Sequence, residues 1–80
     1  MGQKIHTEIT KIAGTTTKDG TYYELQELTQ YNEYDEIIPH YDGEVNWYRV
    51  RKFTPNGMPD GSKDYGPDLN KAYKYLKNRR

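Results

Sequence analysis

The arrangement of apolar and polar positions along the chain predicts three strands followed by one helix. The Asp-Gly pair at residues 19–20 stands between residues that favour strands, which is typical of a hairpin in which both turn positions need a positive φ. We therefore expect a strand over residues 4–18, with a bulge at Gly14, and a second strand over residues 21–31. Residues 3–13 also have isoleucines at helical spacing, so a helix remains the alternative there, although Ile and Thr favour a strand.

Residues 45–54 are the clearest strand, and a helix is predicted at the end of the chain. Residues 55–66 hold three glycines and two prolines, so this segment is predicted to be a loop. Pro67 suits the first helical position and Asp68 suits the first turn. The predicted apolar face of the helix has the spacing i, i+3, i+4, i+7 and consists of Leu69, Ala72, Tyr73 and Leu76.

These elements predict an α+β fold, a small three-stranded antiparallel sheet (β-β-β-α) with one C-terminal helix packed on one face. Residues 32–44 form a long polar connection, and we expect the apolar pair at residues 37–38 to pin it to the core. Eighty residues correspond to a single domain over residues 1–80. Leu, Ile, Val and Phe together number only twelve, so several of the nine tyrosines are expected in the core or at its rim.

The composition excludes some classes of protein and gives little support to catalysis. The absence of cysteine excludes disulfides, thiolate metal sites and a cysteine nucleophile. Ser62, the only serine, lies in a glycine-rich segment without a nearby histidine. His40, Asp42 and Glu44 lie close together, but a metal site needs three or four converging ligands and a solvated acidic loop is the preferred interpretation. No glycine-rich phosphate motif is present. We expect no enzymatic activity, no cofactor and no metal.

The chain also lacks the signals of membrane insertion or secretion. No apolar run approaches the ~20 residues of a membrane span, and the N-terminus lacks the apolar stretch of a signal peptide. We expect a soluble cytoplasmic protein without a membrane partner, located in the host cytoplasm if it is viral. An exposed edge strand in so small a sheet can pair with a second copy, so both monomer and homodimer remain open.

Charges are sorted by sign along the chain, although the net charge is zero. Residues 24–46 contain seven acids and no Lys or Arg, whereas residues 47–80 contain nine bases and three acids. This sorting indicates a charged, aromatic binding surface in each half.

The acidic half leads to the first hypothesis, a protein-binding inhibitor or modulator of a nucleic-acid-handling protein. Spaced carboxylates imitate a row of phosphates, and tyrosines supply rigid contact area, so the segment suits a protein partner with a basic surface. By analogy of size and character, the chain is similar to small phage-type inhibitors of nucleic-acid enzymes, including anti-CRISPR proteins. The alternative is a solvated loop with its rings on the core. The expected binding residues are Tyr31, Glu33, Tyr34, Asp35, Glu36, Tyr41, Asp42 and Glu44.

The basic half leads to the second hypothesis, direct nucleic-acid binding. Alternation places Trp47, Arg49, Arg51 and Phe53 on one face of a strand, where rings stack on bases and guanidinium groups pair with phosphates. In the alternative interpretation, the rings cap the core and the arginines pair with acids of the neighbouring strand, such as those at positions 24 and 27. The expected nucleic-acid-binding residues are Trp47, Arg49, Arg51, Lys52, Lys74, Lys77, Arg79 and Arg80.

Overall fold

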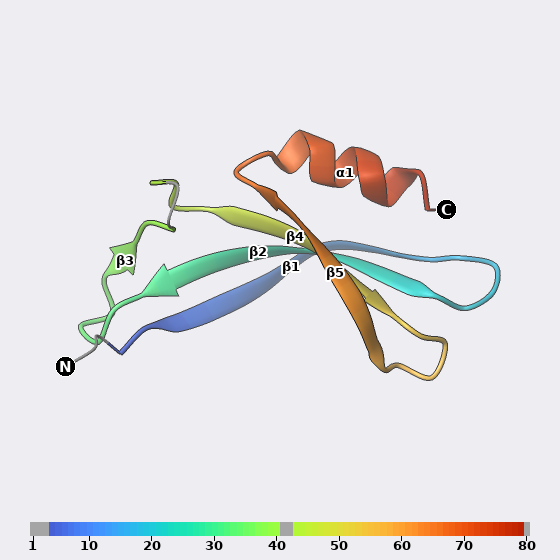
Figure 1. Ribbon diagram of the computed structural model, residues 1–80, viewed down its shortest axis with the longest axis horizontal. Coiled ribbons are helices and arrows are strands. Elements are labelled where there is room, and N and C mark those ends of the chain that lie inside the picture. Colours follow the sequence, from blue (N-terminus) through green and yellow to red (C-terminus); the bar gives the residue numbers. More distant parts are fainter. Residues whose placement is uncertain (1–3, 41–42, 80) are drawn as a thin grey trace.

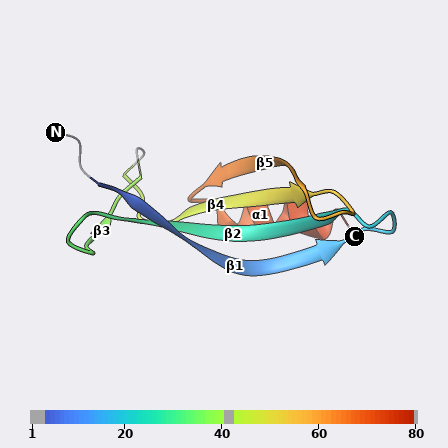
Figure 2. The same ribbon diagram turned by 90° about the horizontal axis from the view of Figure 1, so that it is seen from below.

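The protein is described by a computed structural model that covers residues 4–40 and 43–79. A twisted antiparallel sheet carries one helix on one of its faces (Figures 1 and 2). Across the sheet the strand order is β1-β2-β4-β5, and the short β3 pairs with β2. The elements are β1 (His6–Thr16), β2 (Tyr22–Tyr31), β3 (Ile37–Ile38), β4 (Trp47–Phe53), β5 (Pro59–Gly66) and α1 (Leu69–Lys77).

The α+β fold with a C-terminal helix is confirmed, but the expected three-stranded sheet is wrong because the sheet has five strands. Residues 59–66 were predicted to be a loop and form β5 instead. This strand lies at the edge of the sheet, where Pro59 and Gly61 are tolerated because only one side of the backbone needs a partner. The expectation that the apolar pair at residues 37–38 pins residues 32–44 to the core is wrong. The pair forms the two-residue strand β3 beside the end of β2, and Ile37 is 55 % exposed.

The first segment is a strand, so the helical alternative for residues 3–13 is excluded over the part that β1 covers. The ladder between β1 and β2 shifts register between Lys11 and Ala13, so the bulge lies at Ile12 and not at Gly14 as predicted. Gly14 has a different role, because a Cβ atom there would clash with the hydroxyl of Tyr22.

The hairpin turn also differs from the predicted one. In the turn at residues 17–21 only Gly20 has a positive φ, of 92°, and its N–H donates to the carbonyl three residues earlier at 3.0 Å. This is a type I turn followed by a glycine in the left-handed conformation. Such a turn joins two antiparallel strands with one residue of positive φ, whereas the predicted turn needs two. A second backbone bond, from the N–H of Thr17 to the carbonyl of Thr21, closes the observed turn. The turns at residues 32–36 and 54–58 contain the same two bonds. In the turn at residues 32–36, Asp35 (φ 60°) occupies the position that Gly20 has here.

Helix α1 begins two positions later than the sequence pattern indicated, at Leu69 and not at Pro67. Asp68 is the N-cap and not a first-turn residue, and its side chain accepts a hydrogen bond from the N–H of Lys71 at 3.0 Å. Pro67 therefore precedes the helix. Tyr73 is 36 % exposed, and Tyr75 packs against the core in its place. The buried apolar residues are Leu25, Tyr48, Val50, Ala72 and Leu76.

Replacing Asp68 with alanine is expected to lower the free energy of unfolding by about 1 kcal/mol, because the N–H of Lys71 loses its acceptor. For a chain of this size the melting temperature should fall by roughly 4–8 °C, measured by circular dichroism. The variant Asp68→Ser keeps a side-chain acceptor and should retain most of the stability. Equal losses in both variants would contradict the capping role.

The two faces of the sheet have different environments, and this difference positions the candidate sites. Leu25 and Val50 point toward α1 and pack beneath it. Figure 2 views the opposite face of the sheet, which no helix covers. The end that carries β3 extends beyond α1 (Figure 1), in a molecule of 46 × 26 × 16 Å. Within the described part of the chain, no helix has the length and apolar character needed to cross a membrane.

Candidate functional site

The uncovered side of the sheet carries Trp47, Phe53 and both arginines of β4. Because Leu25 and Val50 point toward α1, the residues next to them along each strand point to the other side. Cross-strand partners on this side are Tyr22 with Phe53, Glu24 with Arg51, Gln26 with Arg49, and Leu28 with Trp47. These eight residues are named the open face below.

One end of the open face contains an aromatic hollow. The rings of Tyr22 and Phe53 lie 5.9 Å apart between centroids, at an angle of 36°. With Glu24 and Pro55 they line a hollow of about 290 Å³ beside the two hairpin turns. That volume is near the lower end of the range for small-molecule sites, and the walls expose ring surface beside one carboxylate. The hollow therefore has the size and chemistry to hold one flat ring.

A chain of hydrogen bonds crosses the centre of the open face. Both Nε and Nη2 of Arg49 donate to Oε1 of Gln26, at 3.2 and 3.0 Å. Nε2 of Gln26 donates to Oε2 of Glu24 at 2.6 Å, and the hydroxyl of Tyr22 donates to Oε1 of Glu24 at 3.2 Å. Gln26 is only 3 % exposed. The network fixes Arg49 through a neutral amide, so its positive charge is held in place without direct pairing to an acid.

Arg51 is the second cation of the open face. Its guanidinium lies over the ring of Phe53, 5.4 Å from the centroid. Among residues 4–40 and 43–79, neither Arg49 nor Arg51 has a carboxylate within ion-pair distance. Glu27 lies on the other side of the sheet, where burial together with this carboxylate raises the pKa of Tyr48. The interpretation in which both arginines pair with acids at positions 24 and 27 is therefore wrong.

Strand β1 adds a third cation to this side of the sheet. Nζ of Lys11 lies 5.5 Å from the centroid of the Tyr22 ring, and the phenol group raises the pKa of Lys11. At the opposite edge of the same side, Asp64 of β5 is the register partner of Arg49. This side of the sheet thus carries Lys11 and two arginines against the carboxylates of Glu24 and Asp64. The sequence pattern alone did not indicate Lys11 or Tyr22, because their position depends on the register of the first hairpin.

The remaining predicted nucleic-acid residues do not join the open face. Lys52 points toward the side of α1, where its Nζ lies 3.5 Å from a carboxylate oxygen of Asp60. Lys74 and Lys77 belong to α1 and Arg79 follows it, so they lie on the opposite side of the sheet from the open face. Arg80 lies outside the described residues. The expected single patch is therefore divided between two sides of the sheet.

The acidic segment is only partly brought together. Glu33, Tyr34, Asp35 and Glu36 lie on one turn, where all four are exposed and Tyr34 is 75 % exposed. The side chain of Asn32 accepts hydrogen bonds from the N–H groups of Tyr34, at 2.8 Å, and Glu36, at 3.0 Å. These bonds fix the turn, named the acidic turn below.

The other residues of the predicted protein-binding set lie elsewhere or are not described. Tyr31 belongs to β2 and stacks on His6 with centroids 5.2 Å apart. Glu44 is exposed near the start of β4. Tyr41 and Asp42 lie outside the described residues. Half of the predicted set therefore shares one surface.

The described segments contain no group of three His, Asp or Glu side chains placed to hold a metal ion. Comparisons with known proteins found no matching family model, no significantly similar curated protein and no significantly similar solved structure.

Proposed function

We propose that the protein binds single-stranded nucleic acid through the open face. Proteins that bind single strands combine aromatic rings, on which bases stack, with cations that pair with phosphates. An antiparallel sheet with helices on its back and rings on its front is one of the frameworks that present such a platform. The open face contains these components on a framework of this kind.

The aromatic hollow is the proposed site for one base. Tyr22 and Phe53 supply ring surface for stacking, which contributes about 1–3 kcal/mol per base in such sites. Glu24 lies at the edge of the hollow and can accept a hydrogen bond from an exocyclic amino group, as carboxylates do with cytosine. A base reaches the hollow only after leaving its stack, which is why the proposal specifies a single strand.

The observation that carries this proposal is the placement of the two arginines. Arg51 lies against Phe53 beside the hollow, and Arg49 is held by Gln26 next along the strand. Since neither pairs with a carboxylate among the described residues, both charges remain for a phosphate backbone. Phosphates neutralised in this way release counterions, which predicts a marked dependence on salt.

Fluorescence anisotropy with labelled single-stranded DNA and RNA is the direct test. With two or three phosphates contacted, affinity for a single strand should fall about tenfold between roughly 50 and 200 mM salt. A duplex of the same sequence should bind more weakly, because its bases are stacked away from the open face. Absence of single-strand binding at the lower salt concentration would refute the proposal.

The acidic turn supports a second candidate function, docking to a basic surface of a protein, with inhibition of a nucleic-acid-handling protein as its consequence. The specific observation in favour is a ring that is 75 % exposed between three carboxylates on a turn fixed by hydrogen bonds. Such a surface supplies contact area at low entropic cost. Charge reversal at Glu33, Asp35 and Glu36 should leave folding unchanged and abolish capture of a basic protein partner. Capture unaffected by all three changes would remove the acidic turn from the interaction.

A further inference from the structure

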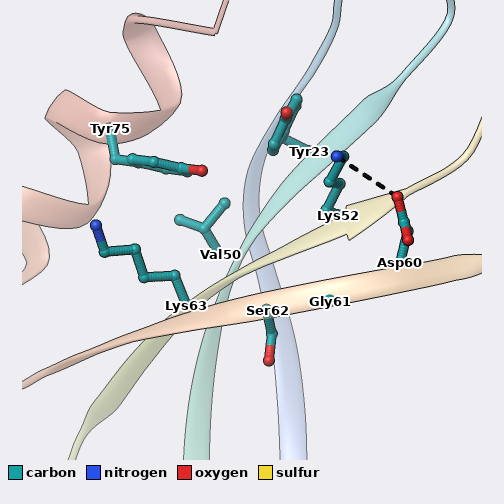
Figure 3. A pocket seen from close by; sticks show the side chains of 8 residues that line it. All are labelled: Tyr23, Val50, Lys52, Asp60, Gly61, Ser62, Lys63 and Tyr75. Carbon is teal, nitrogen blue, oxygen red and sulfur yellow. Dashed lines mark ion pairs between the residues drawn. The ribbon is translucent and has the colours of Figure 1, made fainter.

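A groove lies on the helix side of the sheet, opposite the open face. Two adjoining pockets, of about 230 and 490 Å³, share Tyr23 and Lys52 as lining residues. Figure 3 shows the smaller one, in which Tyr23 and Tyr75 flank the space above Val50 while Ser62 points away from it. The larger one continues toward the first hairpin turn and the end of α1. The pair of pockets is named the helix-side groove.

Cations outnumber carboxylates around the helix-side groove. Its lining includes Lys18, Lys52, Lys63 and Arg79, together with two carboxylates. These charges come from four elements: the first hairpin turn, β4, β5 and the end of α1. Their convergence on one groove follows from the fold, because they lie far apart along the chain.

Both carboxylates of the groove already have partners. Asp60 pairs with Lys52 at 3.5 Å. Asp19 accepts hydrogen bonds from the hydroxyl of Thr17 and the N–H of Thr21, and these bonds lower the pKa of Asp19 to about 2. Within the segments that the structure describes, Lys18, Lys63 and Arg79 have no carboxylate within ion-pair distance.

Aromatic rings, and not acids, hold two of these cations. Nζ of Lys63 lies 5.6 Å from the ring centroid of Tyr65 and 5.2 Å from that of Tyr75. The guanidinium of Arg79 lies 4.4 Å from the centroid of Tyr75 on α1. Nε of Arg79 is buried and has no hydrogen-bond acceptor among the described residues. Ring contacts position a cation without cancelling its charge, so the groove keeps a positive potential.

From this geometry we infer that the helix-side groove binds a phosphate group, at a site separate from the open face. Converging ammonium and guanidinium groups favour a doubly charged anion over a singly charged one. The phosphate is placed where the two pockets adjoin, because the smaller pocket contributes Lys63 and the larger one contributes Lys18 and Arg79. The larger pocket, of about 490 Å³, has room for the part of the ligand that carries the phosphate. The ligand is therefore a phosphate monoester, either a free nucleotide or the end of a nucleic-acid strand.

Backbone amide NMR of the labelled full chain tests this inference, with sodium phosphate and AMP as probes. Both are expected to shift the amides of residues 61–63 in a saturable way, AMP at the lower concentration, while sodium chloride of equal ionic strength does not. A 5′-phosphorylated dinucleotide that binds more tightly than AMP identifies a strand end as the ligand, and weaker or equal binding identifies a free nucleotide. Absence of saturable shifts with both phosphate and AMP would overturn the inference.

Charge-removing variants locate the site. The variant Lys63→Met is expected to weaken phosphate binding about tenfold, because a charge-assisted contact is lost. Lys18→Met, at an exposed turn position, repeats the test with little effect on packing. Lys74→Met removes an exposed charge of α1 that does not line the groove and should change binding less than twofold. Equal losses in Lys63→Met and Lys74→Met would indicate diffuse attraction and contradict a built site.

A variant of the open face separates this inference from the proposed function. Arg51→Met should reduce single-strand binding and leave the phosphate-induced shifts unchanged, because Arg51 lies on the other side of the sheet. A parallel loss of phosphate binding in Arg51→Met would refute a separate site. Failure of single-strand binding with intact phosphate binding would refute only the open-face proposal.

Discussion

Replacing Tyr22 and Phe53 together with leucine is expected to weaken the binding of a single-stranded oligonucleotide about thirtyfold. The two rings flank the aromatic hollow, and stacking on such rings contributes about 1–3 kcal/mol per base, where 1.4 kcal/mol corresponds to a factor of ten. Leucine keeps apolar volume at both positions but offers no ring face to a base. Anisotropy titrations at constant salt measure the change.

A matched control distinguishes stacking from a general loss of tyrosine. Tyr73→Leu removes an exposed ring of α1 on the opposite side of the sheet, and binding should stay within a factor of about two. Thermal unfolding of both variants shows whether the open face stays folded. Full-strength binding by a folded Tyr22/Phe53 double variant would remove the hollow from the proposed mechanism.

Replacing Leu25 with alanine is expected to lower the free energy of unfolding by about 3 kcal/mol, within the range for buried leucines. Leu25 has no exposed surface and lies at the centre of the core beneath α1. The loss is large for a chain of eighty residues, whose total stability is expected to be roughly 4–12 kcal/mol. Urea unfolding followed by circular dichroism gives the free energy, and the slope with denaturant reports whether the transition stays two-state.

The control for this substitution is a branched apolar residue that the fold leaves exposed. Ile9 of β1 is 48 % exposed, so Ile9→Ala should cost less than about 1 kcal/mol. A comparable loss at both positions would mean that the end of the sheet beyond α1 contributes to the core. A loss below about 1 kcal/mol at Leu25 would contradict the placement of the core itself.

Much of the fold was predictable because its signals are local. Strands β1, β2 and β4 and helix α1 lie where propensity and apolar spacing placed them, to within a few residues. Strand β5 was missed because Pro59 and Gly61 favour loops, and only pairing with β4 at the sheet edge makes the segment extended. The position of the bulge was missed for a related reason, since the register between β1 and β2 is set by the whole ladder.

The candidate site also has a part that the sequence predicted and a part that depends on how the strands pair. Alternation correctly placed Arg49 and Arg51 on one side of β4, because successive residues of a strand point to opposite sides. The same rule places Lys52 on the other side, which excludes it from the patch to which it was assigned. Tyr22 completes the aromatic hollow only through its cross-strand register with Phe53.

By itself, the sequence determined the local features of this protein: its first hairpin, its final helix, the separation of acids from bases, and the side of β4 on which its arginines lie. These follow from backbone propensity and from the periodicity of strand and helix, which act over a few residues. Only the tertiary structure decided which side of the sheet α1 covers, and therefore which residues form the open face. It also brought Lys18, Lys63 and Arg79 to one groove. That outcome depends on burying Leu25 and Val50 beneath a helix distant in sequence, an interaction that no local pattern encodes.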